Sequence, residues 1–297
     1  MPGVGVRGVT AYVLVAAAVA LASSLGVRLP TGVELVALAA AVLLLGVPHG
    51  SLDVLHARDS YRLGGIGAWG AFLLAYVLVG AGVVGAWSAA PAICLVGLLA
   101  ISAFHFSGDL DRGAPTLLRV VHGLAPVCLP GLQHRDELGE LFAALAPLPA
   151  ATSLAAALST AAPVLLLASI LATAAHARRH RTAAVEVAAT AALCAAAPPL
   201  LGFGVYFCLL HARRHVGRTR QLYVPSASTM LWAAWLPTAA TALAGAIAFA
   251  LIPAPTSEAG ALRVVFVGLA ALTVPHMLLI EPIRLRGWRR LGPTAAS

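Results

Sequence analysis

Long apolar segments recur along this chain of 297 residues and constrain its fold more than any other feature. A transmembrane helix needs about 20 mostly apolar residues, and such segments alternate here with short stretches containing Pro, Gly or Arg. Charged residues make up only 10% of the chain, against roughly a quarter of a soluble domain. We therefore predict an all-α fold, a polytopic integral membrane helix bundle of about ten transmembrane helices, with eight or nine as the alternatives. The expected spans are 9–29, 34–57, 67–89, 92–110, 115–133, 154–178, 183–200, 202–218, 229–252 and 261–283.

The segments between these spans are short, so residues 1–297 are expected to form a single transmembrane domain. Residues 9–27 are expected to stay as a first helix, because no convincing cleavage site precedes the next span. The chain carries 19 basic and 11 acidic residues. In a membrane protein this balance more often reports topology than nucleic-acid binding, and we expect no nucleic-acid partner. The cysteines are expected to be small buried side chains: Cys94, Cys128, Cys194 and Cys208.

The arginines are distributed unevenly between the two sides of the predicted bundle. With the N-terminus inside, the outer loops hold Arg28 and Arg135, whereas the inner loops and the C-terminal tail hold most of the others. This asymmetry predicts a multi-pass protein of the cell membrane, in the lipid bilayer, with both termini in the cytoplasm. The long outer connection 134–153 contains DELGELFAALAPL, which can form a short interfacial helix. The inner arginines are Arg58, Arg62, Arg112, Arg178, Arg179, Arg181, Arg218, Arg220, Arg284, Arg286, Arg289 and Arg290.

Several histidines fall at one depth of the predicted bundle. His49, His105, His211 and His276 lie on spans running from outside to inside, past the midplane at a rise of about 1.5 Å per residue. His215 lies one turn deeper. Polar side chains inside a bilayer are costly and normally face a cavity, so the shared depth predicts a functional site. Of the others, His122 can lie nearby, His56, His176 and His180 are expected to be solvated beside arginines, and His134 is expected on an outer loop away from the site.

Spacing adds to this prediction. His49 and Asp53, His105 and Asp109, and His211 and His215 are each four residues apart, and residues four apart share one helix face. Two imidazoles one turn apart can bind one metal ion, and a carboxylate one turn from a histidine can accept its second ring N–H. The pairs therefore predict a metal site.

Other roles are open for these side chains. A histidine inside a membrane can simply pack between helices through a hydrogen bond. Asp53 can instead pair with Arg58, and Asp109 with Arg112, at a helix end. An all-imidazole site suits Fe, Cu or Zn and disfavours Mg or Ca. With no thiolate and few carboxylates in reach, Fe(II) that activates O₂ on a lipophilic substrate is the best match.

Four segments resemble signatures of the Brp/Blh β-carotene 15,15′-dioxygenases, a family named for its link to bacteriorhodopsin. GVPHGSLD (46–53) looks like the first signature, Pro-His-Gly-x-x-Asp, and SAFHFSGDL (102–110) is similar to the second. YFCLLHARRH (206–215) resembles the third and TVPHMLLIE (273–281) the last. The segments occur in the expected order over nearly the whole chain. Ser51 stands where we expect Ala, a small change beside the site.

The resemblance implies an Fe(2+)-dependent dioxygenase that cleaves the central double bond of β-carotene with O₂ to give two retinal molecules, which a rhodopsin can receive. By motif position it places the iron-binding histidines at His49, His105, His211 and His215. Asp53 and Asp109 are then candidate orienting carboxylates, and His276 is either a ligand or a pocket residue.

Three rival functions fit the sequence less well. A di-iron membrane hydroxylase or desaturase needs several histidine clusters, of which only HARRH is present. A b-type haem electron carrier would use facing pairs of histidines as axial ligands. A transporter would be expected to show internal repeats and carboxylates at the midplane.

Overall fold

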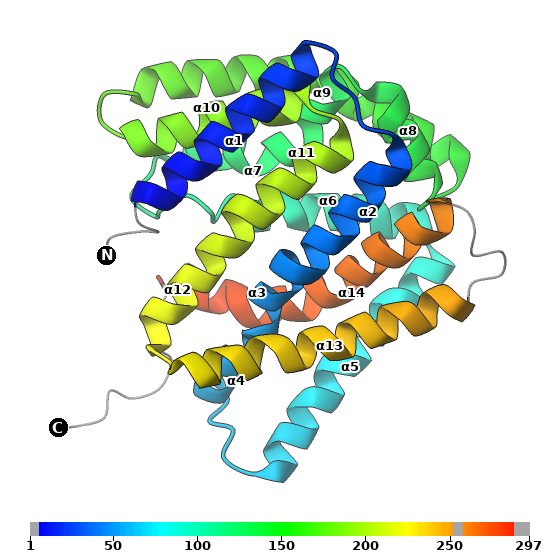
Figure 1. The fold of residues 1–297 in the computed structure, drawn as a ribbon, viewed down its shortest axis with the longest axis vertical. Coiled ribbons are helices and arrows are strands. Elements are labelled where there is room, and N and C mark those ends of the chain that lie inside the picture. The colour runs from blue at the N-terminus through cyan, green and yellow to red at the C-terminus, as the bar shows by residue number, and fades with distance from the viewer. Residues whose placement is uncertain (1–5, 252–257, 288–297) are drawn as a thin grey trace. The chain divides into compact units, whose positions relative to one another are not determined.

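The computed structural model describes residues 6–251 and 258–287, and every regular element in those ranges is a helix (Figure 1). The prediction of an all-α fold is therefore confirmed. The helices are α1 (Val6–Ser24), α2 (Thr31–Ala41), the π-helix η1 (Val42–Gly46), α3 (Val47–Ser51), α4 (Asp53–Ser60), α5 (Ile66–Ala89), α6 (Pro91–Phe106), α7 (Thr116–Cys128), the 3₁₀-helix η2 (Leu129–Leu132), α8 (Arg135–Ala143), α9 (Leu148–His176), α10 (Arg181–Ala196), α11 (Pro199–Tyr206), the π-helix η3 (Phe207–Ala212), α12 (Arg213–Tyr223), α13 (Ala227–Leu251) and α14 (Glu258–Leu285).

A helix, or a run of consecutive helices, lies over each segment that hydropathy predicts to span the membrane. Among the described residues, 5 helical segments are long and apolar enough to cross a bilayer, and three shorter apolar helices accompany them. Helix lengths alone do not establish about ten membrane spans. The long segments are Gly32–Ser60, Ile66–Ala89, Leu148–His176, Ala227–Leu251 and Glu258–Leu285, and the short ones are Gly8–Ser24, Pro91–Phe106 and Thr116–Leu132.

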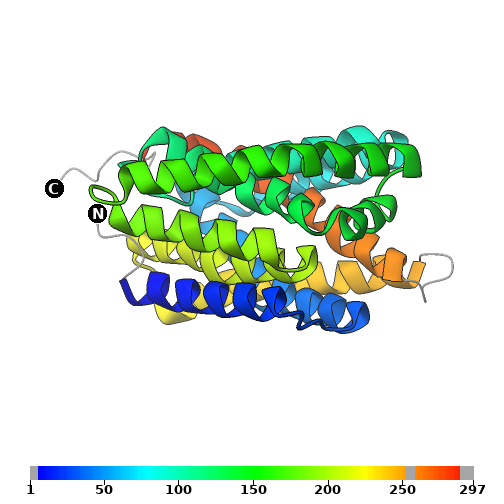
Figure 2. The same ribbon diagram turned by 90° about the horizontal axis from the view of Figure 1, so that it is seen from above.

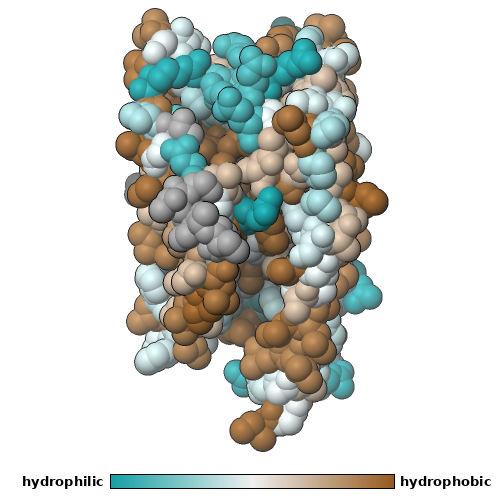
Figure 3. Space-filling view, turned by 90° about the vertical axis from the view of Figure 1, so that its right-hand side faces the viewer, coloured by the Kyte–Doolittle hydropathy of each residue, from teal (hydrophilic) through white to brown (hydrophobic). Residues whose placement is uncertain are grey.

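The long apolar helices expose much of their apolar surface. None of the residues in the most apolar 18-residue stretch of α5 is buried. Its exposed side chains include Leu74, Val77 and Leu78. Figure 3 shows hydrophobic residues over much of one face, with the largest group of hydrophilic residues at its upper edge. Many exposed large apolar side chains of this kind indicate contact with a partner or a membrane. This exposure is compatible with a membrane protein.

The chain divides into two compact units, each made of two separate stretches of sequence. Unit 1 comprises 1–42 and 91–211, and unit 2 comprises 43–90 and 212–297. In unit 1, α10 contacts both α1 and α9, and Figures 1 and 2 show it lying between them. Tyr12 on α1 and Thr190 on α10 share a hydrogen bond of 2.8 Å. Cys128 and Cys194, in the core formed by α7, α9 and α10, and Cys208 are buried as expected, whereas Cys94 is only partly buried.

Glycine allows α6 and α7 to approach closely within unit 1. A Cβ atom added to Gly123 on α7 would lie 2.2 Å from the carbonyl oxygen of Ala103 on α6. Real side chains cannot occupy that distance, so only glycine permits this approach. The contact fixes the end of α6, which carries His105, against α7.

Unit 2 is built around α14, which contacts α3, α4, α5 and α13. Gly80 on α5 lies against the backbone of Ala271 on α14. Ser51 on α3 and Thr238 on α13 share a hydrogen bond of 3.0 Å. These contacts hold α3, α5 and α14 together, and each of these helices supplies a polar side chain to the site described below.

Two π-helical segments lie beside predicted site residues. η1 ends at Gly46, two residues before Pro48 and three before His49, and η3 contains His211. Proline has no N–H and disrupts the regular hydrogen-bond pattern one turn earlier, which accounts for the irregularity near Pro48. π-Segments within α-helices are frequent at functional sites because they redirect side chains. The segment η3 contains no proline, and no proline lies within one turn of it, so proline does not cause this second π-segment.

Candidate metal centre

In unit 1, His105 and His211 lie together with the carboxylate of Asp109. The ring centroids of the two histidines are 4.9 Å apart, and all three side chains are buried. Nδ1 of His211 donates to both carboxylate oxygens of Asp109, over 3.0 and 3.1 Å. The hydroxyl of Tyr206 donates to Oδ2 of the same carboxylate over 2.6 Å. Asp109 therefore holds the imidazole of His211 in one orientation and one tautomer.

Aromatic rings surround this group in unit 1. Phe207 stacks on His211 with centroids 5.4 Å apart, and Phe106 meets it edge-on at 5.0 Å. His122 is fully buried and meets the ring of Tyr206 at 5.7 Å. Because these apolar rings exclude water, the hydrogen bonds to Asp109 act in a medium of low dielectric constant and are stronger than in water.

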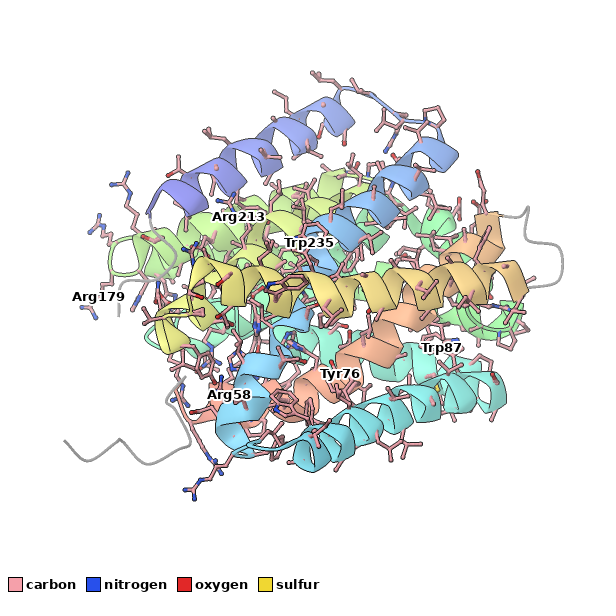
Figure 4. The ribbon with its side chains drawn as sticks, turned by 60° about the horizontal axis from the view of Figure 1, so that its bottom comes forward. Arg58, Tyr76, Trp87, Arg179, Arg213 and Trp235 are labelled. Carbon is pink, nitrogen blue, oxygen red and sulfur yellow. The ribbon has the colours of Figure 1, made fainter. Side chains whose placement is uncertain are left out.

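In unit 2, Asp53 plays the same part for a different histidine. Nδ1 of His276 on α14 donates to Oδ1 of Asp53 over 2.8 Å. The hydroxyl of Tyr76 on α5, labelled in Figure 4, donates to Oδ2 over 3.0 Å. Nδ1 of His49 is hydrogen-bonded to the backbone oxygen of Gly46. Each unit thus has a buried carboxylate that accepts one imidazole N–H and one tyrosine hydroxyl.

Three imidazoles of unit 2 lie close together. The ring centroids of His49 and His215 are 5.4 Å apart, those of His49 and His276 are also 5.4 Å apart, and those of His215 and His276 are 5.1 Å apart. Ligand atoms of Asp53, His215 and His276 lie within 4.8 Å of one another. Buried nitrogen and oxygen donors at such distances can hold a transition metal.

His56 belongs to a buried chain of hydrogen bonds, which contradicts the expectation that it is solvated. Its side chain is 0% exposed, Nε2 lies 3.0 Å from Oγ1 of Thr219, and Nδ1 lies 3.0 Å from the hydroxyl of Tyr223. Thr219 donates its single hydroxyl proton to the carbonyl of His215 over 3.0 Å. It therefore accepts from His56 Nε2, and Tyr223 donates to Nδ1. The chain ends on the helical turn that carries His215.

His134 lies in a connection between helices, as expected, and its side chain is buried there. It is 3% exposed, and its ring nitrogens contact Glu137 Oε1 at 3.1 Å and the carbonyl of Ala196 at 3.2 Å. It lies directly before α8, the helix expected in this connection. His176 and His180 are partly exposed, as expected for residues at an interface.

The structure buries all the predicted site residues but pairs the carboxylates differently. Asp53 was expected to accept a hydrogen bond from His49 on the same helix face, and its imidazole partner is His276 instead. The reason is that α3 ends at Ser51, and a turn at Leu52 separates it from Asp53 in α4. Asp109 likewise follows the end of α6 at Phe106, in a turn, and reaches His211.

Two site residues were not assigned this role from the sequence. Tyr206 lies five residues before His211 in YFCLLH, but nothing in that segment indicates that its hydroxyl contacts Asp109. Tyr76 lies in an apolar helix with no nearby motif, and its contact with Asp53 bridges 23 residues. No local pattern indicates it.

Comparison with known proteins agrees with the sequence signatures. The family model of β-carotene 15,15′-dioxygenase matches residues 40–283, which include every histidine and carboxylate described in the two groups. This chain belongs to that family. A β-carotene 15,15′-dioxygenase from uncultured marine bacterium 66A03 is 32% identical over 270 residues, covering 82% of this chain and 91% of the relative. No solved structure matches the chain.

Proposed function

We propose that this protein is a membrane-embedded, iron-dependent dioxygenase that cleaves the central 15,15′ double bond of β-carotene with O₂ to give two molecules of retinal. The observation that carries the proposal is the family match over residues 40–283, with the relative that bears this name. Retinal is the aldehyde cofactor of opsins, so we propose a rhodopsin as its recipient.

The donor set fits iron. We propose that His49, His105, His211 and His215 bind one Fe(2+) per chain. Imidazole suits Fe, Cu and Zn. His211 donates a hydrogen bond to the carboxylate of Asp109, and such a carboxylate commonly orients a metal-binding histidine. His211 and His215 lie four residues apart in the sequence, in η3 and α12. Bound Fe(2+) supplies the activation of O₂.

The protein's own residues have three tasks in this proposal. Asp109 holds the imidazole of His211 in the tautomer whose Nε2 is the ligand atom, and Gly46 accepts from His49 Nδ1 in the same way. Phe106 and Phe207 exclude water around His211. The apolar helices keep the chain in the phase in which β-carotene dissolves, so substrate reaches it without crossing water.

Expression in a carotene-accumulating bacterial host tests the activity. We expect loss of orange colour and formation of retinal, identified by chromatography and mass. His49→Ala, His105→Ala, His211→Ala and His215→Ala are each expected to abolish retinal formation while the protein still reaches the membrane. His180→Ala, on the turn between α9 and α10, is the matched control. If the host that expresses the wild-type protein keeps its orange colour, although the protein is present in the membrane, the proposal is contradicted.

Metal content and topology are tested separately. Purified protein is expected to contain one iron per chain and to lack the sharp Soret band of a haem protein. We further propose a multi-pass arrangement with both termini cytoplasmic, supported by the positions of the arginines. A reporter fused after Ser297, which lies outside the described residues, is expected to be active in the cytoplasm. Activity in the periplasm would invert this topology.

A further inference from the structure

His276 belongs to a buried group of potential metal ligands in unit 2, together with Asp53 and His215. It is 4% exposed, and its Nδ1 donates to Asp53, whose second oxygen accepts from Tyr76. A neutral imidazole that donates from Nδ1 carries its lone pair on Nε2. Asp53 therefore fixes both the tautomer and the ring orientation of His276, as a carboxylate does for a metal-binding histidine.

The distances between imidazoles support a shared ligand role. Three rings from three different helices, α3, α12 and α14, form a nearly equilateral triangle with centroid separations of 5.1 to 5.4 Å. With metal–nitrogen bonds of about 2.0–2.1 Å, three imidazoles bound to one ion hold their ring centroids about 5 Å apart. The rings meet at 64° to 85°, edge-on rather than stacked. Stacked rings would not direct their nitrogen atoms to a common point.

We propose that His276 binds the metal ion together with His49 and His215, and that Asp53 orients it. This inference rests on the proposed function, since it requires that the protein binds a metal. It assigns His276 a role as a direct ligand, beyond the four histidines that the family signatures indicate. Asp53 then acts on His276 rather than on its neighbour in sequence, His49.

Metal affinity tests the role of His276 without measuring catalysis. The probe is Co²⁺, bound to the purified full-length protein in detergent and withdrawn by a competing chelator. Visible absorption of bound Co²⁺ reports the number and type of its ligands. His276→Ala is expected to weaken Co²⁺ binding by more than about 100-fold and to change the absorption spectrum, whereas Asp53→Asn, which removes only an orienting partner, is expected to weaken it by about 10- to 100-fold.

Chemical rescue separates a ligand from a packing residue. Millimolar imidazole can enter the space left by His276→Ala and is expected to restore Co²⁺ affinity and the wild-type spectrum. His180→Ala is the control and should bind Co²⁺ like the wild type. Where His276→Ala elutes as an aggregate, His276→Gln, which fills a similar volume, replaces it and is expected to show the same loss of affinity.

The outcomes distinguish this inference from the proposed function. A His276→Ala protein with wild-type affinity and spectrum overturns the ligand role and leaves the proposed function intact. Equal losses in His276→Ala and Asp53→Asn, with no rescue by imidazole, also overturn it, because His276 then acts only through position. Wild-type protein that binds no Co²⁺ contradicts the metal centre itself.

Discussion

His211 and Asp109, which are 102 residues apart in sequence, are joined by hydrogen bonds from one imidazole nitrogen to both carboxylate oxygens. Both side chains are 4% exposed. Asp109→Asn keeps the shape but replaces a charged acceptor by a neutral amide. We expect iron affinity and retinal formation to fall by about 10- to 100-fold. Asp111→Asn, in the exposed turn that follows, is the control. Unchanged iron content and turnover in Asp109→Asn would remove Asp109 from the site.

The hydroxyl of Tyr206 is expected to stabilise the fold through the same carboxylate. Tyr206→Phe removes only the oxygen that donates to Asp109 over 2.6 Å. A hydrogen bond to a charged group contributes about 1.5–3 kcal/mol, so the variant should unfold at a lower temperature in detergent. Tyr61→Phe, at a ring that is 58% exposed, should leave the unfolding temperature unchanged. Equal unfolding temperatures for the two variants would show that the bond to Asp109 contributes nothing.

The chain from Tyr223 through His56 to Thr219 is expected to support the helical turn of His215. Thr219→Val keeps the side-chain shape but removes both the acceptor for His56 Nε2 and the donor to the His215 carbonyl. Loss of a buried partner costs about 1–3 kcal/mol of unfolding free energy. Thr152→Val, at an exposed threonine that donates to its own helix, should cost far less. Thermal unfolding of both variants measures the difference.

These contacts show which parts of the site are encoded locally. Each apolar segment that hydropathy predicts is helical in the structure, because a long apolar segment satisfies its backbone best as a helix. The burial of His49, His105 and His211 likewise follows from their apolar surroundings. The acceptor of each imidazole does not, because it depends on where a helix ends and on which distant element packs beside that end.

The expectation that His56 is solvated was wrong for a related reason. Its neighbour Arg58 indicated an interfacial position, whereas the structure places His56 against Thr219, 163 residues away. Spacing describes one helix face at a time. A contact between helices that are distant in sequence depends on how the helices pack, and one chain's residue pattern does not specify that packing.

Close packing of α6 on α7 predicts a strong effect at Gly123. In Gly123→Ala the new methyl group would meet the Ala103 carbonyl oxygen at 2.2 Å, so the two helices must separate. Overpacking typically costs about 1–3 kcal/mol, and the end of α6 that carries His105 would move. We expect a lower unfolding temperature and lower iron content. Gly97→Ala on α6, where nothing lies within 4 Å of the added atom, should be neutral or slightly stabilising. Similar behaviour of the two variants would contradict the close approach.

The chemistry of the proposed reaction makes a final prediction. Two retinal molecules form from β-carotene only if both carbons of the central double bond gain an oxygen atom. Phe106 and Phe207 pack on His211, and the five histidines of the two groups are each at most 7% exposed. Such surroundings hold little water, which limits side reactions with solvent. We therefore expect both atoms of one O₂ molecule to enter the products.

Labelling with ¹⁸O₂ measures this directly. Free aldehydes exchange their oxygen with water, so the products must be reduced to retinol as they form. Label in essentially all of the retinol is the expected result, and ¹⁸O-labelled retinal added to a parallel mixture under unlabelled O₂ measures how much label is lost by exchange before trapping. Label in half of the retinol, with water as the source of the rest, would indicate a monooxygenase. That result would contradict the dioxygenase reaction but not the metal ligands, because the binding measurements on His276 and Asp109 do not depend on where the oxygen atoms go.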